Sequence, residues 1–199
     1  MLKKKKIYGL TGMSGAGKTT VSNVFKECGF EVINCDKVAR EVTEKGTACL
    51  NEIAEKFDGV ITADGTLDRK KLGNIVFNDS NQLKILNDTI YPYITYRVIK
   101  QIENADNEFI LLDAPTLFES GIDFICDGVV SVVCDRERSV ERIMVRDNIT
   151  RETAQSRLSS QQDKDFYIKR SLYAIENNGT QQELIEIAEK TALQILRGI

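Results

Sequence analysis

The chain has 199 residues, of which 42% are hydrophobic and 29% charged, which is the composition of a globular protein with a sizeable core. Its net charge of -3 lacks the strong basic excess of nucleic-acid-binding proteins, so we expect no nucleic-acid partner. The absence of histidine excludes Ser-His-Asp catalysis, Cys-His catalysis and histidine-ligated metal sites.

The amino terminus predicts neither a targeting signal nor a membrane anchor. After Lys3–Lys6 only Ile7–Leu10 precede a polar loop, whereas the apolar core of a signal peptide needs roughly 7 residues or more. The five cysteines form no C-x-x-C pair and are odd in number, which indicates neither a disulfide framework nor a zinc site. We expect a cytoplasmic protein with reduced thiols and no membrane contact.

The first part of the chain alternates strand and helix. Ile7–Thr11 is a short apolar strand, and Lys18–Cys28 follows as an amphipathic helix that Gly29 ends. The apolar face of this helix consists of Val21, Val24, Phe25 and Cys28. Glu31–Cys35 is expected to be the second strand.

The remaining elements follow a largely helical stretch, about 37–104. Phe109–Asp113 and Val129–Val133 are continuous aliphatic runs, typical of strands that helices cover on both faces. A polar, arginine-bearing segment, about 136–170, comes next. A capping-box pattern, Thr180–Glu183, then begins a final helix. Its apolar side contains Leu184, Ile187, Ala188, Thr191 and Ile195.

Strands separated by helices predict a parallel, doubly wound α/β sheet, because right-handed crossovers connect such strands most economically. The helical insert and the arginine-bearing segment lie outside that core, and we interpret them as substrate-binding and lid elements.

The segment Gly12–Thr19 (GMSGAGKT) fits the phosphate-binding P-loop pattern G-x-x-x-x-G-K-(S/T), between a strand and a helix. Its glycines let successive N–H groups point inward, where the helix dipole also favours an anion. Lys18 can reach the β- and γ-phosphates, and the Thr19 hydroxyl can ligate Mg²⁺. The sequence therefore predicts a nucleotide site that uses ATP and Mg²⁺.

Other patterns restrict what is done with the nucleotide. The glycine spacing differs from the dinucleotide fingerprint, which excludes NAD and FAD. A GTPase would need D-x-x-G and (N/T)-K-x-D motifs, and the chain contains neither. An ATPase motor commonly has glutamate after the strand-end aspartate, where this chain has Ala114. A small-molecule kinase is the function that these patterns favour.

Two aspartates follow strands at the edge where open α/β sheets bind ligands. Asp36 can accept a hydrogen bond from an attacking hydroxyl, and it could equally be the N-cap of a helix over 37–44. Asp113 could hold the water shell of Mg²⁺ or the substrate, or it could be a turn residue ahead of Pro115.

The polar segment after the fourth strand contains Arg142, Arg146, Arg151 and Arg157. Arg142 and Arg146 are four residues apart and share one face of a helix. Two guanidinium groups on that face could neutralise the charge of a phosphoryl-transfer transition state. The alternative is a solvated helix face on which the arginines pair with Glu141, Asp147 and Glu152.

These residues resemble the dephospho-coenzyme A kinase family nearly from end to end. The motifs that carry the resemblance are GLTGMSGAGKTTV at 9–21, NCDKVAREV at 34–42, DGTLDR at 64–69 and LDAPTLFE at 112–119, followed by Arg142, Arg146-Asp147, Arg157, Gln161, Ile175, Asn177 and Gly179. The P-loop alone occurs in many families, whereas this ordered set is much more selective.

The resemblance implies ATP-dependent phosphorylation of the ribose 3′-hydroxyl of dephospho-coenzyme A. By this match the catalytic residues are Asp36, as the base, with Lys18, Arg142 and Arg146. The residues expected to bind ATP are Gly12, Ser14, Gly15, Ala16, Gly17, Lys18, Thr19, Thr20, Asn177 and Gly179. Those expected to bind the acceptor are Arg40, Leu67, Asp68, Arg69, Asp113 and Pro115.

We therefore expect one P-loop kinase domain over 1–199, a three-layer α/β/α fold with a doubly wound, parallel five-stranded sheet. Its core comprises 1–36, 105–138 and 171–199. An acceptor-binding helical insertion covers about 37–104, and a lid covers about 139–170. Whether the chain is a monomer or a small homo-oligomer is left open.

The chain departs from the family pattern at four positions. Asn34 replaces an aspartate, Tyr91 a histidine, Leu172 an aspartate and Thr116 a leucine. Two alternative functions stay open: a nucleoside- or nucleotide-type kinase with another acceptor, and a nucleotide-binding regulator without catalysis.

Overall fold

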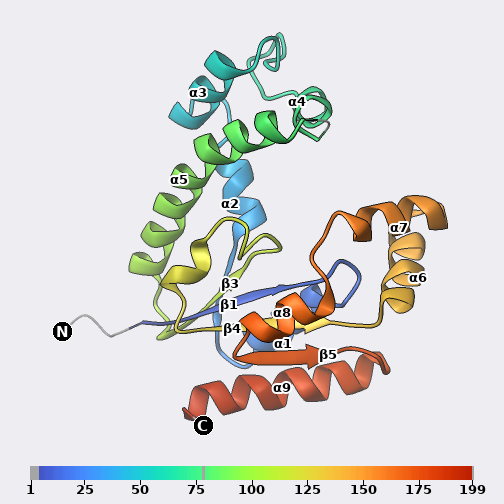
Figure 1. Cartoon of the computed structure of the whole chain (residues 1–199). Helices are drawn as coiled ribbons and strands as arrows, with labels where there is room; N and C mark the ends of the chain where they lie inside the picture. Colours follow the sequence, from blue (N-terminus) through green and yellow to red (C-terminus); the bar gives the residue numbers. More distant parts are fainter. Residues whose placement is uncertain (1–4, 78, 199) are drawn as a thin grey trace. The chain divides into compact units, whose positions relative to one another are not determined.

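The structure is a computed structural model that describes residues 5–77 and 79–198. Contacts between residues divide the chain into two compact units (Figure 1). Met1–Ile33 and Ala105–Ile199 form the first, here called the sheet unit. Asn34–Asn104 form the second, here called the helical unit.

A five-stranded sheet is the centre of the sheet unit. Its strands are β1 (Lys6–Gly12), β2 (Glu31–Asn34), β3 (Phe109–Asp113), β4 (Gly128–Val133) and β5 (Tyr173–Glu176), in the spatial order β2-β3-β1-β4-β5. The pairs β1–β3, β1–β4 and β4–β5 are parallel. The predicted doubly wound, parallel five-stranded sheet is thus confirmed.

Helices follow the strands as the sequence predicted. They are α1 (Lys18–Glu27), α6 (Arg136–Asp147), α7 (Arg151–Ser159), α8 (Lys164–Arg170) and α9 (Gln181–Arg197), with a 3-10 helix at Ile122–Ile125. α1 packs against α9, and α8 packs against β4 and β5. The capping box that begins α9 is confirmed, because Thr180 accepts from the Glu183 N–H and Glu183 accepts from the Thr180 N–H.

The helical unit contains α2 (Cys35–Glu41), α3 (Ala48–Lys56), α4 (Arg69–Val76) and α5 (Ser80–Asn104). It has a hydrophobic cluster of its own, built from Cys49, Ile53, Phe57, Val60, Leu72 and Val76. α5 packs against α2, α3 and α4 and so connects the unit internally. The insertion is therefore a compact structure with its own core and not a long surface loop.

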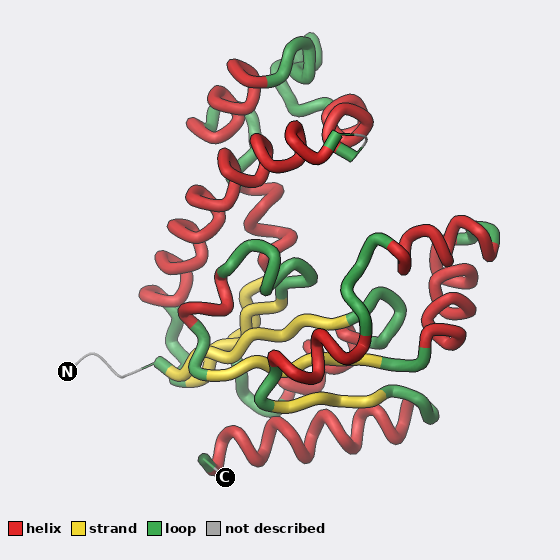
Figure 2. Tube along the Cα trace, in the orientation of Figure 1, coloured by secondary structure: helices red, strands yellow, loops and turns green. Residues whose placement is uncertain are grey.

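The carboxyl ends of the strands meet at one edge of the sheet (Figure 2). Leu10 pairs with Asp113, Gly12 with Val132, and Val133 with Glu176. The residues that follow β1, β3, β4 and β5 therefore lie close together at this edge. This is the edge at which open α/β sheets bind ligands.

Two details differ from the sequence-based expectation. The strand predicted as Glu31–Cys35 ends at Asn34, because Cys35 already belongs to α2. Strand β5 was not located from the sequence, because it has only four residues and Ile175 is its one buried side chain.

In residues 5–77 and 79–198, no helix is long and apolar enough to cross a membrane.

Candidate active site

The P-loop connects β1 to α1 through a backbone that only glycine adopts easily. Gly12, Gly15 and Gly17 have φ of 146°, 78° and 101°. A Cβ on Gly17 would lie 2.7 Å from Nδ2 of Asn177, so a side chain cannot be placed there without moving Asn177. α1 begins at Lys18, and its N-terminal N–H groups face the loop.

Asn177, directly after β5, connects the P-loop to the sheet edge. Its Nδ2 donates to the carbonyl of Ala16 at 2.8 Å, and its backbone N–H donates to the carbonyl of Val133 at 2.8 Å. The residue is 6% exposed and Ala16 is fully buried. Because a buried unpaired carbonyl costs about 1–3 kcal/mol, this bond stabilises the curled loop.

Arg142 of α6 donates hydrogen bonds both to the P-loop and to Asn177. Its Nη1 donates to the carbonyls of Gly15 and Asn177 at 3.4 and 3.2 Å, and its Nη2 donates to Oδ1 of Asn177 at 3.3 Å. The predicted lid residue Arg142 is thus brought to the P-loop. The expectation of a solvated, acid-paired helix face does not describe it.

Arg146, one turn further along α6, is placed differently. Its guanidinium donates to both carboxylate oxygens of Asp147, at 2.7 and 2.9 Å. Arg157 of α7 donates to the same carboxylate at 2.5 Å. The hydrogen bonds from Arg146 hold the pKa of Asp147 below its ordinary value. For Arg146 and Arg157 the expected pairing with Asp147 is confirmed.

Lys18 and Asp113 form an ion pair at the strand edge. Their side chains are 17% and 7% exposed, so the pair is largely shielded from solvent. The predicted phosphate-binding lysine and the strand-end aspartate therefore meet. Pro115 lies close by, where its carbonyl accepts from the Thr11 hydroxyl at 3.1 Å.

Gln161, between α7 and α8, also reaches the P-loop. Its Oε1 accepts from the Ser14 N–H at 3.0 Å. It occurs in the sequence motif series, but it was not among the predicted site residues. It lies within the polar lid segment, where spacing gives no sign of a contact with a residue 147 positions away.

Three further residues were predicted to bind ATP: Thr19, Thr20 and Gly179. Thr19 is exposed in the first turn of α1, and Thr20 donates its N–H to the Gly17 carbonyl at 3.0 Å. Gly179 is exposed, one residue before the N-cap of α9. Thr19 is therefore not buried in the core.

Four of the residues predicted for the acceptor, together with Asp36, belong to the helical unit. Asp36 and Arg40 are exposed on α2, and Asp68 is the N-cap of α4. Arg69 donates to the Thr43 hydroxyl at 2.8 Å, and Leu67 forms a β-bridge with Ile61. Asp113 and Pro115 belong to the sheet unit.

The alternative role of Asp36 as a helix N-cap is wrong. Asn34 is the N-cap of α2, because its side chain accepts from the Lys37 N–H at 2.8 Å. α2 therefore begins at Cys35, and the Asp36 carboxylate lies in the first helical turn. Asparagine caps helices about as well as aspartate, so the change at position 34 preserves this function.

No group of three or more Cys, Asp or Glu side chains that could hold a metal occurs in the described part of the chain. Thr19 and Asp113 are oxygen donors of the kind that Mg²⁺ accepts.

Comparisons with known proteins give one consistent family. Residues 6–183 match the family model described as dephospho-CoA kinase. A dephospho-CoA kinase from Fusobacterium nucleatum is 38% identical over 186 residues, which cover 92% of this chain and 95% of that protein.

Two solved structures are similar over nearly the whole chain. A Thermus thermophilus protein superposes with a TM-score of 0.87 at 29% identity, covering 98% of this chain and 99% of that one. The dephospho-CoA kinase from Campylobacter jejuni gives a TM-score of 0.73 at 28% identity, with 98% of each chain covered.

The shielded pair of Lys18 and Asp113 gives the first testable prediction. Lys18→Ala should lower the free energy of unfolding by about 3 kcal/mol, because it leaves a buried carboxylate without its cation. Adding Asp113→Asn should restore part of that loss, since a neutral amide needs no counter-charge. Denaturant unfolding of the three proteins measures both effects, and a Lys18→Ala variant as stable as the parent would contradict them.

Proposed function

Because the chain belongs to the dephospho-CoA kinase family, we propose that it transfers the γ-phosphoryl group of ATP to the ribose 3′-hydroxyl of dephospho-coenzyme A. The products are coenzyme A and ADP. The single observation that supports this most strongly is the P-loop at the sheet edge, with Lys18 at the start of α1 and Arg142 beside it.

On the donor side, we assign the ATP phosphates to the N–H groups that the curled P-loop presents. Lys18 would exchange its contact with Asp113 for the β- and γ-phosphates as these arrive. Arg142 is already held at the loop by Asn177, so its charge would be close to the transferred group. Arg146 would have to leave Asp147 to contribute in the same way.

We propose that Mg²⁺ accompanies ATP, with the Thr19 hydroxyl as a protein ligand and Asp113 holding its water shell. When bound, the ion would neutralise charge on the β- and γ-phosphates. The exposed position of Thr19 and the position of Asp113 at the end of β3, paired with Lys18, support these assignments.

On the acceptor side, Asp36 is the proposed base. Its carboxylate accepts the proton of the 3′-hydroxyl while the hydroxyl oxygen bonds to the γ-phosphorus and the bond to ADP breaks. Arg40, Leu67, Asp68 and Arg69 would bind the acceptor within the helical unit, with Asp113 and Pro115 from the sheet unit. Phosphoryl transfer depends mainly on such positioning, so an ordinary aspartate suffices.

Residues 139–170 would act as a lid that excludes water, which otherwise competes with the acceptor for the γ-phosphoryl group. We expect the enzyme to act in the cytoplasm as a monomer or small homo-oligomer. Cys28, Cys49 and Cys134 are free thiols, the usual state in a reducing compartment.

The direct test is ADP release from ATP and Mg²⁺ with dephospho-coenzyme A, with adenosine, or with no acceptor. We expect release to depend on dephospho-coenzyme A, and to be at least about tenfold slower with adenosine, because adenosine lacks the charged groups that the arginines bind. A preference for adenosine would favour a nucleoside kinase. ATP binding without release in any mixture would favour a non-catalytic regulator.

Replacing the proposed base separates catalysis from binding. Asp36→Asn should lower kcat by about 100-fold or more, because the amide cannot accept the hydroxyl proton. The affinity for ATP should stay within about twofold, since the P-loop belongs to the other unit. Asn34→Asp is a matched control that keeps the N-cap of α2 and should retain activity. Undiminished turnover of Asp36→Asn would reject this role.

A further inference from the structure

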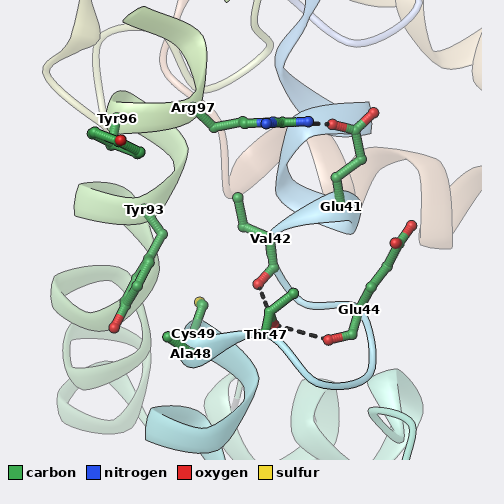
Figure 3. Close-up of a pocket in the computed structure, with 9 residues that line it drawn as sticks. All are labelled: Glu41, Val42, Glu44, Thr47, Ala48, Cys49, Tyr93, Tyr96 and Arg97. Atoms are coloured by element: carbon green, nitrogen blue, oxygen red, sulfur yellow. Dashed lines mark hydrogen bonds and ion pairs between the residues drawn. The ribbon is translucent and has the colours of Figure 1, made fainter. Parts of the chain in front are cut away.

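The helical unit contains a cavity of about 520 Å³ between the α2–α3 connection and α5. Glu41, Val42 and Cys49 line one wall, and Tyr93, Tyr96 and Arg97 of α5 line the other (Figure 3). All its lining residues belong to one unit, so the cavity is complete within the helical unit. Its size suits one segment of a small-molecule ligand.

The residues that line the cavity are suited to binding a ligand and not to catalysing a reaction. Burial raises the pKa of the Cys49 thiol to about 11. The hydrogen bond from Tyr93 to Glu52, 3.0 Å long, raises the pKa of Tyr93. Neither group is therefore a nucleophile at neutral pH. The tyrosine rings, Val42 and Cys49 instead offer apolar surface to a ligand.

One end of the cavity is polar and incompletely satisfied. Oε2 of Glu41 is buried and accepts no hydrogen bond from any residue in the described part of the chain. Its ion pair with Arg97 is 3.8 Å long, beyond hydrogen-bond distance. An acceptor oxygen thus lies beside a guanidinium group with N–H groups to donate. An amide, which has both an N–H and a carbonyl, complements this pair.

The cavity directly follows the proposed acceptor residues along α2. Glu41 is five residues after Asp36, which is about 7.5 Å along the helix axis, and is next to Arg40. Arg69 donates to Thr43, which lies between the lining residues Val42 and Glu44. Along α2 the unit therefore presents a carboxylate, a cation and then the polar end of an apolar cavity, with Arg69 as a second cation held beside it at Thr43.

Dephospho-coenzyme A has its parts in the same order. Its reacting hydroxyl is followed by a diphosphate and then by the pantetheine arm, an apolar chain interrupted by two amides. We infer that this cavity holds the pantetheine arm, with the methylene groups against Tyr96 and one amide between Glu41 and Arg97. This inference rests on the proposed function and assigns a substrate-specificity site within it.

The test compares two acceptors that share the reacting ribose but differ in the arm: dephospho-coenzyme A and AMP. Tyr96→Ala should lower kcat/KM for dephospho-coenzyme A about tenfold, because it removes apolar contact with the arm. The kcat/KM for AMP should change by less than about twofold. Tyr96→Phe should behave like the parent, since the ring is retained.

Phe77→Ala is the matched control, because Phe77 is an aromatic residue of the same unit, 80% exposed and outside the cavity lining. It should affect neither acceptor. Equal losses with both acceptors, or no loss with dephospho-coenzyme A, would overturn the arm site. Failure of the parent protein to phosphorylate dephospho-coenzyme A would instead reject the proposed function on which the inference rests.

Discussion

The candidate site depends on one buried amide, that of Asn177. Its Nδ2 satisfies the carbonyl of Ala16, which the curled P-loop directs away from solvent, and its Oδ1 receives Arg142. Because residue 17 is glycine and has no side chain, the amide of Asn177 can contact the loop directly. The end of β5, the P-loop and the arginine of α6 therefore form one hydrogen-bonded group. A loop that must present its N–H groups to phosphates is held in that shape by neighbours whose own polar groups are satisfied.

The division into two units separates two tasks. The sheet unit carries the residues proposed to bind ATP, and most residues proposed to bind the acceptor lie in the helical unit. The helical unit has a buried cluster of its own, so changes within it need not disturb the sheet unit. If the cavity holds part of the acceptor as we infer, its residues can change and alter acceptor choice while the P-loop stays the same. This is a physical reason why one phosphate-binding loop supports kinases with many acceptors.

Much of this was predictable because the relevant signals are local. The P-loop is a contiguous pattern, the apolar runs of β3 and β4 identify buried strands, and Thr180 with Glu183 identifies the start of α9. Strand β5 escaped prediction because it is short and has one inward side chain. The bond between Gln161 and Ser14 joins residues far apart in sequence, and the capping role of Asn34 competes with Asp36 two residues away. Such choices depend on tertiary contacts and on single hydrogen bonds, which propensity and spacing do not determine.

The most direct measurement is to identify the product by nuclear magnetic resonance after the protein, ATP, Mg²⁺ and dephospho-coenzyme A have reacted. The account predicts a new phosphate monoester at the ribose 3′ position, formed in equal amount to ADP. Formation of ADP with free inorganic phosphate and no ester would contradict it, because the γ-phosphoryl group would then have gone to water. An ester at any other hydroxyl would contradict the proposed placement of the acceptor against Asp36.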